Sequence, residues 1–149
     1  AMSGKFDIYT VTNNGREYKV TQDYYYWYKD EWLIVPKGFI TDFASIPRVF
    51  WNIYPPTDIY MPAALLHDFH YACELKSPLP YAKDMDTRYW CDCLFYDVMK
   101  DCGCNWFTRT VMYRAVRDWG WIVWNSSGHS EQALETRKLL THIQWNPPK

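Results

Sequence analysis

The spacing of apolar and polar residues divides the chain into two kinds of sequence. Residues 6–40 are rich in β-branched and aromatic side chains, broken by polar residues at 13–15 and at 29–31. Short runs of this kind between turn signals are typical of strands. The pattern therefore predicts an antiparallel meander with strands at 7–12, 18–28 and 31–35.

Beyond the strands, apolar residues recur with the three-and-four spacing of helices. This spacing predicts four helices, at residues 62–74, 84–101, 105–119 and 130–143. Glycines often follow a helix, so Gly103 and Gly120 should mark the ends of the second and third helices. The sequence thus predicts an α+β fold in which a small N-terminal antiparallel sheet precedes a bundle of about four helices.

No internal repeat and no evident linker divides the chain, so we expect residues 1–149 to form one domain. Residues 1–4 are typical of a cloning remnant, and residues 144–149 of a frayed tail. No apolar run approaches the roughly 20 residues that span a bilayer. With 16 basic and 17 acidic residues the net charge is −1, which gives no strong signal for a nucleic-acid partner.

Two parts of the composition bear on chemistry. The five cysteines are an odd number, and their C-x-C spacing differs from that of zinc sites, so we expect reduced thiols. Aromatic residues make up 19% of the chain. Most should fill the core, and an exposed subset would stack on sugars, on bases or on a partner protein.

The strongest candidate for chemistry is the pair His67-Asp68 inside an otherwise apolar helix. Helical spacing puts His67 on one face with Tyr71 and turns Asp68 about 100° away. We predict that Asp92 on the next helix accepts a hydrogen bond from His67 and leaves the second ring nitrogen facing water as a general base. The alternative is a core histidine satisfied by a neighbouring carboxylate or carbonyl.

The loop at residues 38–48 is polar at Thr41, Asp42, Ser45 and Arg48. Loops of this kind often carry function, although Asp42 and Ser45 could equally cap a short helix that begins near Pro47. If the loop is functional, Asp68 and Asp42 are candidate ligands for a divalent cation, with calcium favoured, that would polarise a scissile bond.

Two arginines are further candidates. Arg48 and Arg117 could bind a phosphate or carboxylate of a substrate as planar forks. The alternative for each is an ion pair with a local acid such as Asp42 or Asp118.

The motifs GF-x-TDFASIPR at residues 38–48 and HD-x-x-Y at residues 67–71, with Asp92, Met99 and Arg117, carry a resemblance. Together they resemble a family of short proteins of unknown function encoded by tailed bacteriophages and prophages, over roughly residues 35–124. The resemblance implies a phage origin and a shared site, and it supplies no activity.

The helix pair alone is similar to that of small calcium-dependent secreted phospholipases. That similarity implies His67 as the base, Asp68 as a calcium ligand and Asp92 as the residue that orients the histidine. The chain departs from the phospholipases in having no Gly-x-Gly calcium loop and no matching cysteine framework.

Two functions follow from these patterns. The clustering of residue types favours a small metal-assisted hydrolase of an ester, phosphodiester or cell-envelope bond. The alternative is a non-catalytic phage accessory protein, either a virion component or an inhibitor of a host defence protein, in which the same residues form a buried network. Either protein would act in the cytoplasm of the infected bacterium or in the virion, on a host or phage partner.

Overall fold

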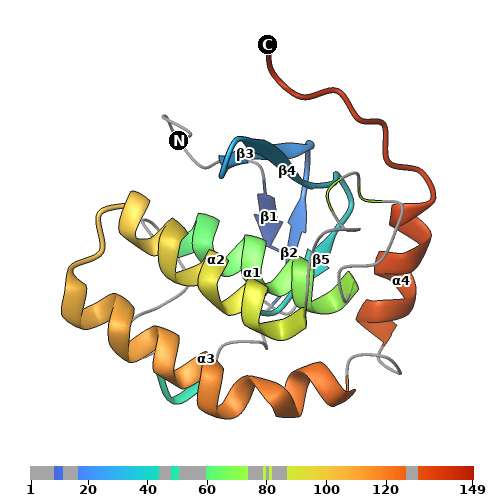
Figure 1. Ribbon diagram of the computed structural model, residues 1–149. Helices are drawn as coiled ribbons and strands as arrows, with labels where there is room; N and C mark the ends of the chain where they lie inside the picture. Colours follow the sequence, from blue (N-terminus) through green and yellow to red (C-terminus); the bar gives the residue numbers. More distant parts are fainter. Residues whose placement is uncertain are drawn as a thin grey trace.

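The computed structural model describes residues 9–11, 17–43, 48–50, 60–73, 79, 81, 87–126 and 131–149. Short strands precede the helices, so the predicted α+β fold is confirmed (Figure 1). The strands are β1 (Tyr9–Val11), β2 (Tyr18–Val20), β3 (Tyr24–Tyr28), β4 (Glu31–Val35) and β5 (Ile40–Thr41). The helices are α1 (Met61–Cys73), α2 (Thr87–Asp101), α3 (Trp106–Ser126) and α4 (Glu131–Leu140), with a 3-10 turn η1 (Arg48–Phe50).

The described strands form two small antiparallel sheets, whereas the sequence predicts a single meander. One sheet has the order β1-β2-β5, and the other pairs β3 with β4. The prediction of one strand over residues 18–28 is wrong, because β2 ends at Val20 and β3 starts at Tyr24 in the other sheet. β5 lies inside the polar loop and pairs with β2, and it is too short for an alternating pattern to reveal it.

The β3–β4 hairpin confirms the predicted break near residue 29. Lys29 and Asp30 have φ of 46° and 64°, and Tyr28 pairs with Glu31 across them. Two successive residues with positive φ are the geometry of a tight hairpin turn whose twist matches that of the strands. The predicted turn at residues 13–15 lies outside the described residues.

Helix α1 is the centre of the molecule. It contacts α2, α3, α4, β4 and β5, and all of its residues except Pro62 are buried. In Figure 1, α1 and α2 run side by side, with the strands behind them and α3 across their other face. The polar residues of α1 are therefore buried in the core.

The helix ends show two different uses of glycine. Gly103 has φ of +95° just after α2, as predicted for a glycine that ends a helix. The prediction that Gly120 ends the third helix is wrong, because α3 continues to Ser126. A Cβ at Gly120 would lie 2.6 Å from the Tyr71 hydroxyl oxygen, so this glycine makes room for a side chain of α1.

The C-terminal segment contacts the second sheet. Tyr25 donates a hydrogen bond from its hydroxyl to the carbonyl of Gln144 at 3.2 Å, and the amide of Asn146 donates to the same hydroxyl at 2.8 Å. The ring of Trp145 packs edge-on against Tyr25 with centroids 5.7 Å apart. The segment assigned to a frayed tail thus includes residues that contact β3.

Among the described helices, none is long and apolar enough to cross a bilayer.

Candidate functional site

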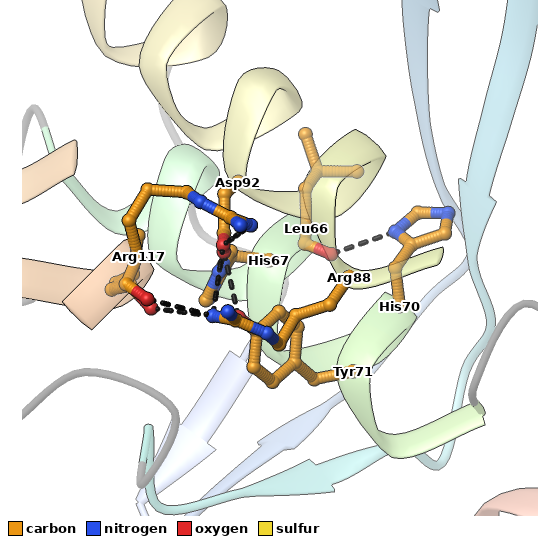
Figure 2. Close-up of polar contacts among 8 residues, drawn as sticks. Leu66, His67, His70, Tyr71, Arg88, Asp92 and Arg117 are labelled. Carbon is orange, nitrogen blue, oxygen red and sulfur yellow. Dashed lines mark hydrogen bonds and ion pairs between the residues drawn. The ribbon is translucent and has the colours of Figure 1, made fainter. Parts of the chain in front are cut away.

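His67 and Asp92 meet between α1 and α2, as the helical spacing predicts. The distance from His67 Nε2 to Asp92 Oδ1 is 2.7 Å, and both side chains are fully buried (Figure 2). Because an ionised carboxylate only accepts hydrogen bonds, Nε2 carries the proton and donates it. The histidine tautomer is therefore fixed by the carboxylate.

Asp92 accepts hydrogen bonds from more than the histidine. Its Oδ1 also accepts from the Tyr71 hydroxyl at 2.7 Å, and its Oδ2 accepts from Arg117 at 2.8 Å and from Arg88 at 3.3 Å. We call His67, Tyr71, Arg88, Asp92 and Arg117 the Asp92 cluster. Its members come from α1, α2 and α3, so one carboxylate joins three helices.

Electrostatics keeps this carboxylate ionised. Burial acts to raise the pKa of Asp92, but hydrogen bonds and charge from His67, with Tyr71 and Arg117, outweigh it and leave the pKa below its ordinary value. Burial together with the Asp92 charge raises the pKa of Tyr71 well above its ordinary value, so the phenol keeps its proton and acts as a donor.

Arg88 binds the backbone of α3 as well as the carboxylate. Its Nη1 donates to the carbonyl of Val116 at 2.9 Å and to the carbonyl of Arg117 at 3.2 Å. These carbonyls lie within one turn of Gly120, and a Cβ there would come within 3.2 Å of the same Nη1. The glycine therefore lets both Tyr71 and Arg88 approach α3 closely.

The surroundings of His67 limit what the ring can do chemically. The ring is 0% exposed and packs against Tyr71 and Phe95, with centroids 4.2 Å and 4.8 Å away. A general base must come within hydrogen-bond reach of the proton that it removes, directly or through water.

A second buried histidine lies one turn further along α1. His70 donates from Nδ1 to the carbonyl of Leu66 at 2.7 Å, and its Nε2 accepts from the Tyr81 hydroxyl at 3.0 Å. Burial lowers the pKa of His70 to about 4, so the ring is neutral near pH 7. Its partners carry no charge, in contrast to those of His67.

Asp68, the predicted metal ligand next to His67, contacts the polar loop at residues 38–48. Its Oδ2 accepts a hydrogen bond from the Thr41 hydroxyl, and the amide of Phe43 donates to that hydroxyl oxygen at 2.9 Å. Asp68 and Thr41 are buried, and Asp42 is half-buried. The contact between Thr41 and Asp68 joins β5 to α1.

Three or more His, Cys, Asp or Glu side chains gathered as metal ligands are found nowhere in the described part of the chain. The predicted calcium site at Asp68 and Asp42 thus gains no support from the geometry.

The remaining predicted residues are placed as follows. Ser45 and the side chain of Arg48 lie outside what the structure describes. Arg117 pairs with Asp92, whereas the neighbouring Asp118 pairs with Arg114 at 3.3 Å. All five cysteines lie within the described residues, and none of them forms a disulfide.

Sequence reasoning does not identify two members of the site. Arg88 carries a usable signal, because it precedes Asp92 by four residues and so shares a helix face with it. Gly120 carries only an ambiguous signal, because a glycine can end a helix or allow close packing inside one.

Comparisons with known proteins give a family and no solved relative. Residues 18–116 match the model of a family described as "Protein of unknown function (DUF1353)". The uncharacterized protein y4jT of Sinorhizobium fredii is 33% identical over 115 residues, which cover 76% of this chain and 28% of that protein. The chain therefore spans less than a third of that relative. No solved structure matches the chain.

Proposed function

The chain belongs to the DUF1353 family of proteins of unknown function, and we propose that it is a non-catalytic phage accessory protein that acts by binding another protein chain. The phage origin rests on the resemblance carried by the GF-x-TDFASIPR and HD-x-x-Y motifs. The infected cell or the virion would be its place of action.

The observation that carries the proposal is the saturation of Asp92. Four donors from three helices occupy its two oxygens, and His67 is sealed beside it. Buried polar networks in which every member is satisfied fix the arrangement of a core. The Asp92 carboxylate, with both oxygens hydrogen-bonded, is satisfied in this way, which supports a structural role for the residues that resemble a catalytic site.

The surface supports action by binding. Large apolar side chains stay exposed at one position of α2 and towards both ends of α3: Tyr89, Trp106, Phe107, Trp119, Trp121 and Ile122. Tryptophan, tyrosine and phenylalanine are enriched in protein interfaces. The exposed aromatic residues of these helices are therefore the part of the molecule best suited to contact a partner.

Replacing His67 tests the structural role. We expect His67→Ala to lower the free energy of unfolding in urea by about 1–3 kcal/mol, because buried donors and acceptors lose a partner. The matched control is His142→Ala, at an exposed histidine, which should change it by less than about 0.5 kcal/mol. A His67→Ala protein as stable as the parent, with an esterase or phosphodiesterase activity of the parent lost, would overturn the proposal.

A second candidate function is hydrolysis with His67 as the base. One observation favours it: His67 donates to Asp92, the pairing that the similarity to phospholipases implies. In that case calcium should raise the melting temperature of the parent by binding the native state, and the parent should turn over ester or phosphodiester substrates. Turnover without any metal effect would support hydrolysis and exclude the predicted cation.

A further inference from the structure

The outward face of α3 carries a regular stripe of side chains. Phe107, Val111, Arg114, Asp118 and Trp121 follow one another at alternating steps of four and three residues. This spacing is the heptad seam of a coiled coil, in which successive positions lie on one side of the helix. We call these five residues the α3 seam.

The α3 seam faces solvent over most of its length. Phe107 and Trp121, near its two ends, are 64% and 52% exposed. In the middle, Arg114 and Asp118 form an ion pair whose side chains are 66% and 50% exposed. Figure 1 shows α3 at the lower edge of the molecule, with α1 and α2 on its other side. A seam with apolar ends and a charged centre is therefore available to a partner.

The order of residues in the α3 seam makes it complementary to itself. Its last four residues are symmetric about position 116, with Arg114 two residues before and Asp118 two residues after, whereas Phe107 lies outside this symmetric set. Val111 and Trp121 lie five residues before and after the same point. When two such helices pack antiparallel about a twofold axis, each residue meets the one at the mirrored position. Arg114 then faces the partner's Asp118, and Val111 faces the partner's Trp121.

We propose that a second copy of this chain binds the α3 seam, so that two α3 helices pack antiparallel in a symmetric dimer. The argument is charge complementarity: the pairing places opposite charges together at both central positions. A parallel arrangement would place Arg114 against the partner's Arg114 and Asp118 against the partner's Asp118. Polar residues at seam positions commonly select register and orientation in this way. The inference rests on the proposed function, in which this protein binds another chain, and it identifies that other chain as a second copy of the same protein.

Charge reversal in the full-length chain tests the pairing. The parent should sediment as a dimer in analytical ultracentrifugation at low salt. In Arg114→Asp both central positions become acidic, and in Asp118→Arg both become basic. Each variant alone should therefore dimerise with an affinity at least tenfold weaker than that of the parent, and should sediment as a monomer. The matched control is Glu135→Lys, which breaks the exposed Lys138–Glu135 pair of α4 and should leave the dimer intact.

Mixing the two variants gives the decisive result. Arg114→Asp and Asp118→Arg complement each other in an antiparallel pair, so an equimolar mixture should form a heterodimer with near-parent affinity. Misfolding of either variant could not produce this recovery.

Several results would overturn the dimer. The first is a parent that stays monomeric in a concentration series up to about millimolar. The second is a dimer that neither charge reversal weakens. The third is a mixture of the two variants that stays monomeric. A monomeric parent that binds vesicles or another protein through Trp121 would also overturn it. The stability of His67→Ala is measured separately, so failure of the dimer leaves the structural role of the Asp92 cluster to its own test.

Discussion

His67 and His70 lie three residues apart on α1, and both are fully buried, yet their surroundings differ in charge. His67 donates to the ionised carboxylate of Asp92, which also binds two arginines. His70 contacts a backbone carbonyl and a tyrosine hydroxyl, both neutral. The comparison shows that burial alone does not define what a histidine does. The charge of the partner also matters: the hydrogen bond of His67 requires an ionised carboxylate, whereas the hydrogen bonds of His70 require a neutral ring.

Removing the shared carboxylate should have the largest effect. In Asp92→Asn the two arginines and the histidine keep their positions but lose the charge between them, and breaking a buried ion pair in this way costs about 3–5 kcal/mol. The matched control is Asp118→Asn, at an exposed ion pair, where the loss should be under about 1 kcal/mol. Urea denaturation measures both. Equal losses in the two variants would show that Asp92 does not join the helices.

Acid should act through His70. Its folded pKa of about 4 lies below the 6.5 of an exposed histidine, so the unfolded chain binds the proton more readily. Its contribution to stability is therefore complete above pH 6.5 and is lost as the pH falls toward 4, by about 3 kcal/mol in total. Unfolding free energies measured across this range give the slope.

The matched variant for this pH effect is His70→Gln, which keeps a polar side chain without the titrating ring. Its unfolding free energy should depend less steeply on pH between 6.5 and 4 than that of the parent. If the two slopes coincide, the neutral surroundings of His70 do not govern the acid response.

A smaller effect is expected where α3 approaches the Asp92 cluster. In Gly120→Ala the added Cβ would lie 2.6 Å from the Tyr71 hydroxyl oxygen, and such overpacking costs about 1–3 kcal/mol. Removing that oxygen in Tyr71→Phe should make the same Gly120→Ala change less costly. Thermal unfolding of the four combinations measures the relief. An alanine cost that is the same in both backgrounds would rule out this contact as its cause.

Much of the site follows from helical spacing. His67, Tyr71 and Asp92 lie in strongly apolar helical segments, so the period of the pattern fixes which side chains share a face. Their pairing across α1 and α2 could therefore be predicted, and so could the α+β order of strands and helices. The hairpin turn at Lys29 could be predicted too, because polar residues interrupt two β-rich runs there.

The parts that could not be predicted depend on tertiary contacts. The polar residues 21–23 between Val20 and Tyr24 allow a break in the strand, but that β2 and β3 then belong to different sheets depends on which strands they pair with. Gly120 fits a helix end as well as a helix interior until the position of Tyr71 is known. The role of Asp92 likewise depends on Arg88 and Arg117, which reach it from two different helices, and on a degree of burial that one sequence does not reveal.

The central claim is that the contact between His67 and Asp92 holds the fold together. A double-mutant cycle of His67→Gln and Asp92→Asn, followed by urea denaturation, measures their coupling most directly. We predict that His67→Gln alone destabilises the chain and that the two residues are coupled by about 1–3 kcal/mol. A His67→Gln protein as stable as the parent, with effects that add within about 0.5 kcal/mol, would contradict the account.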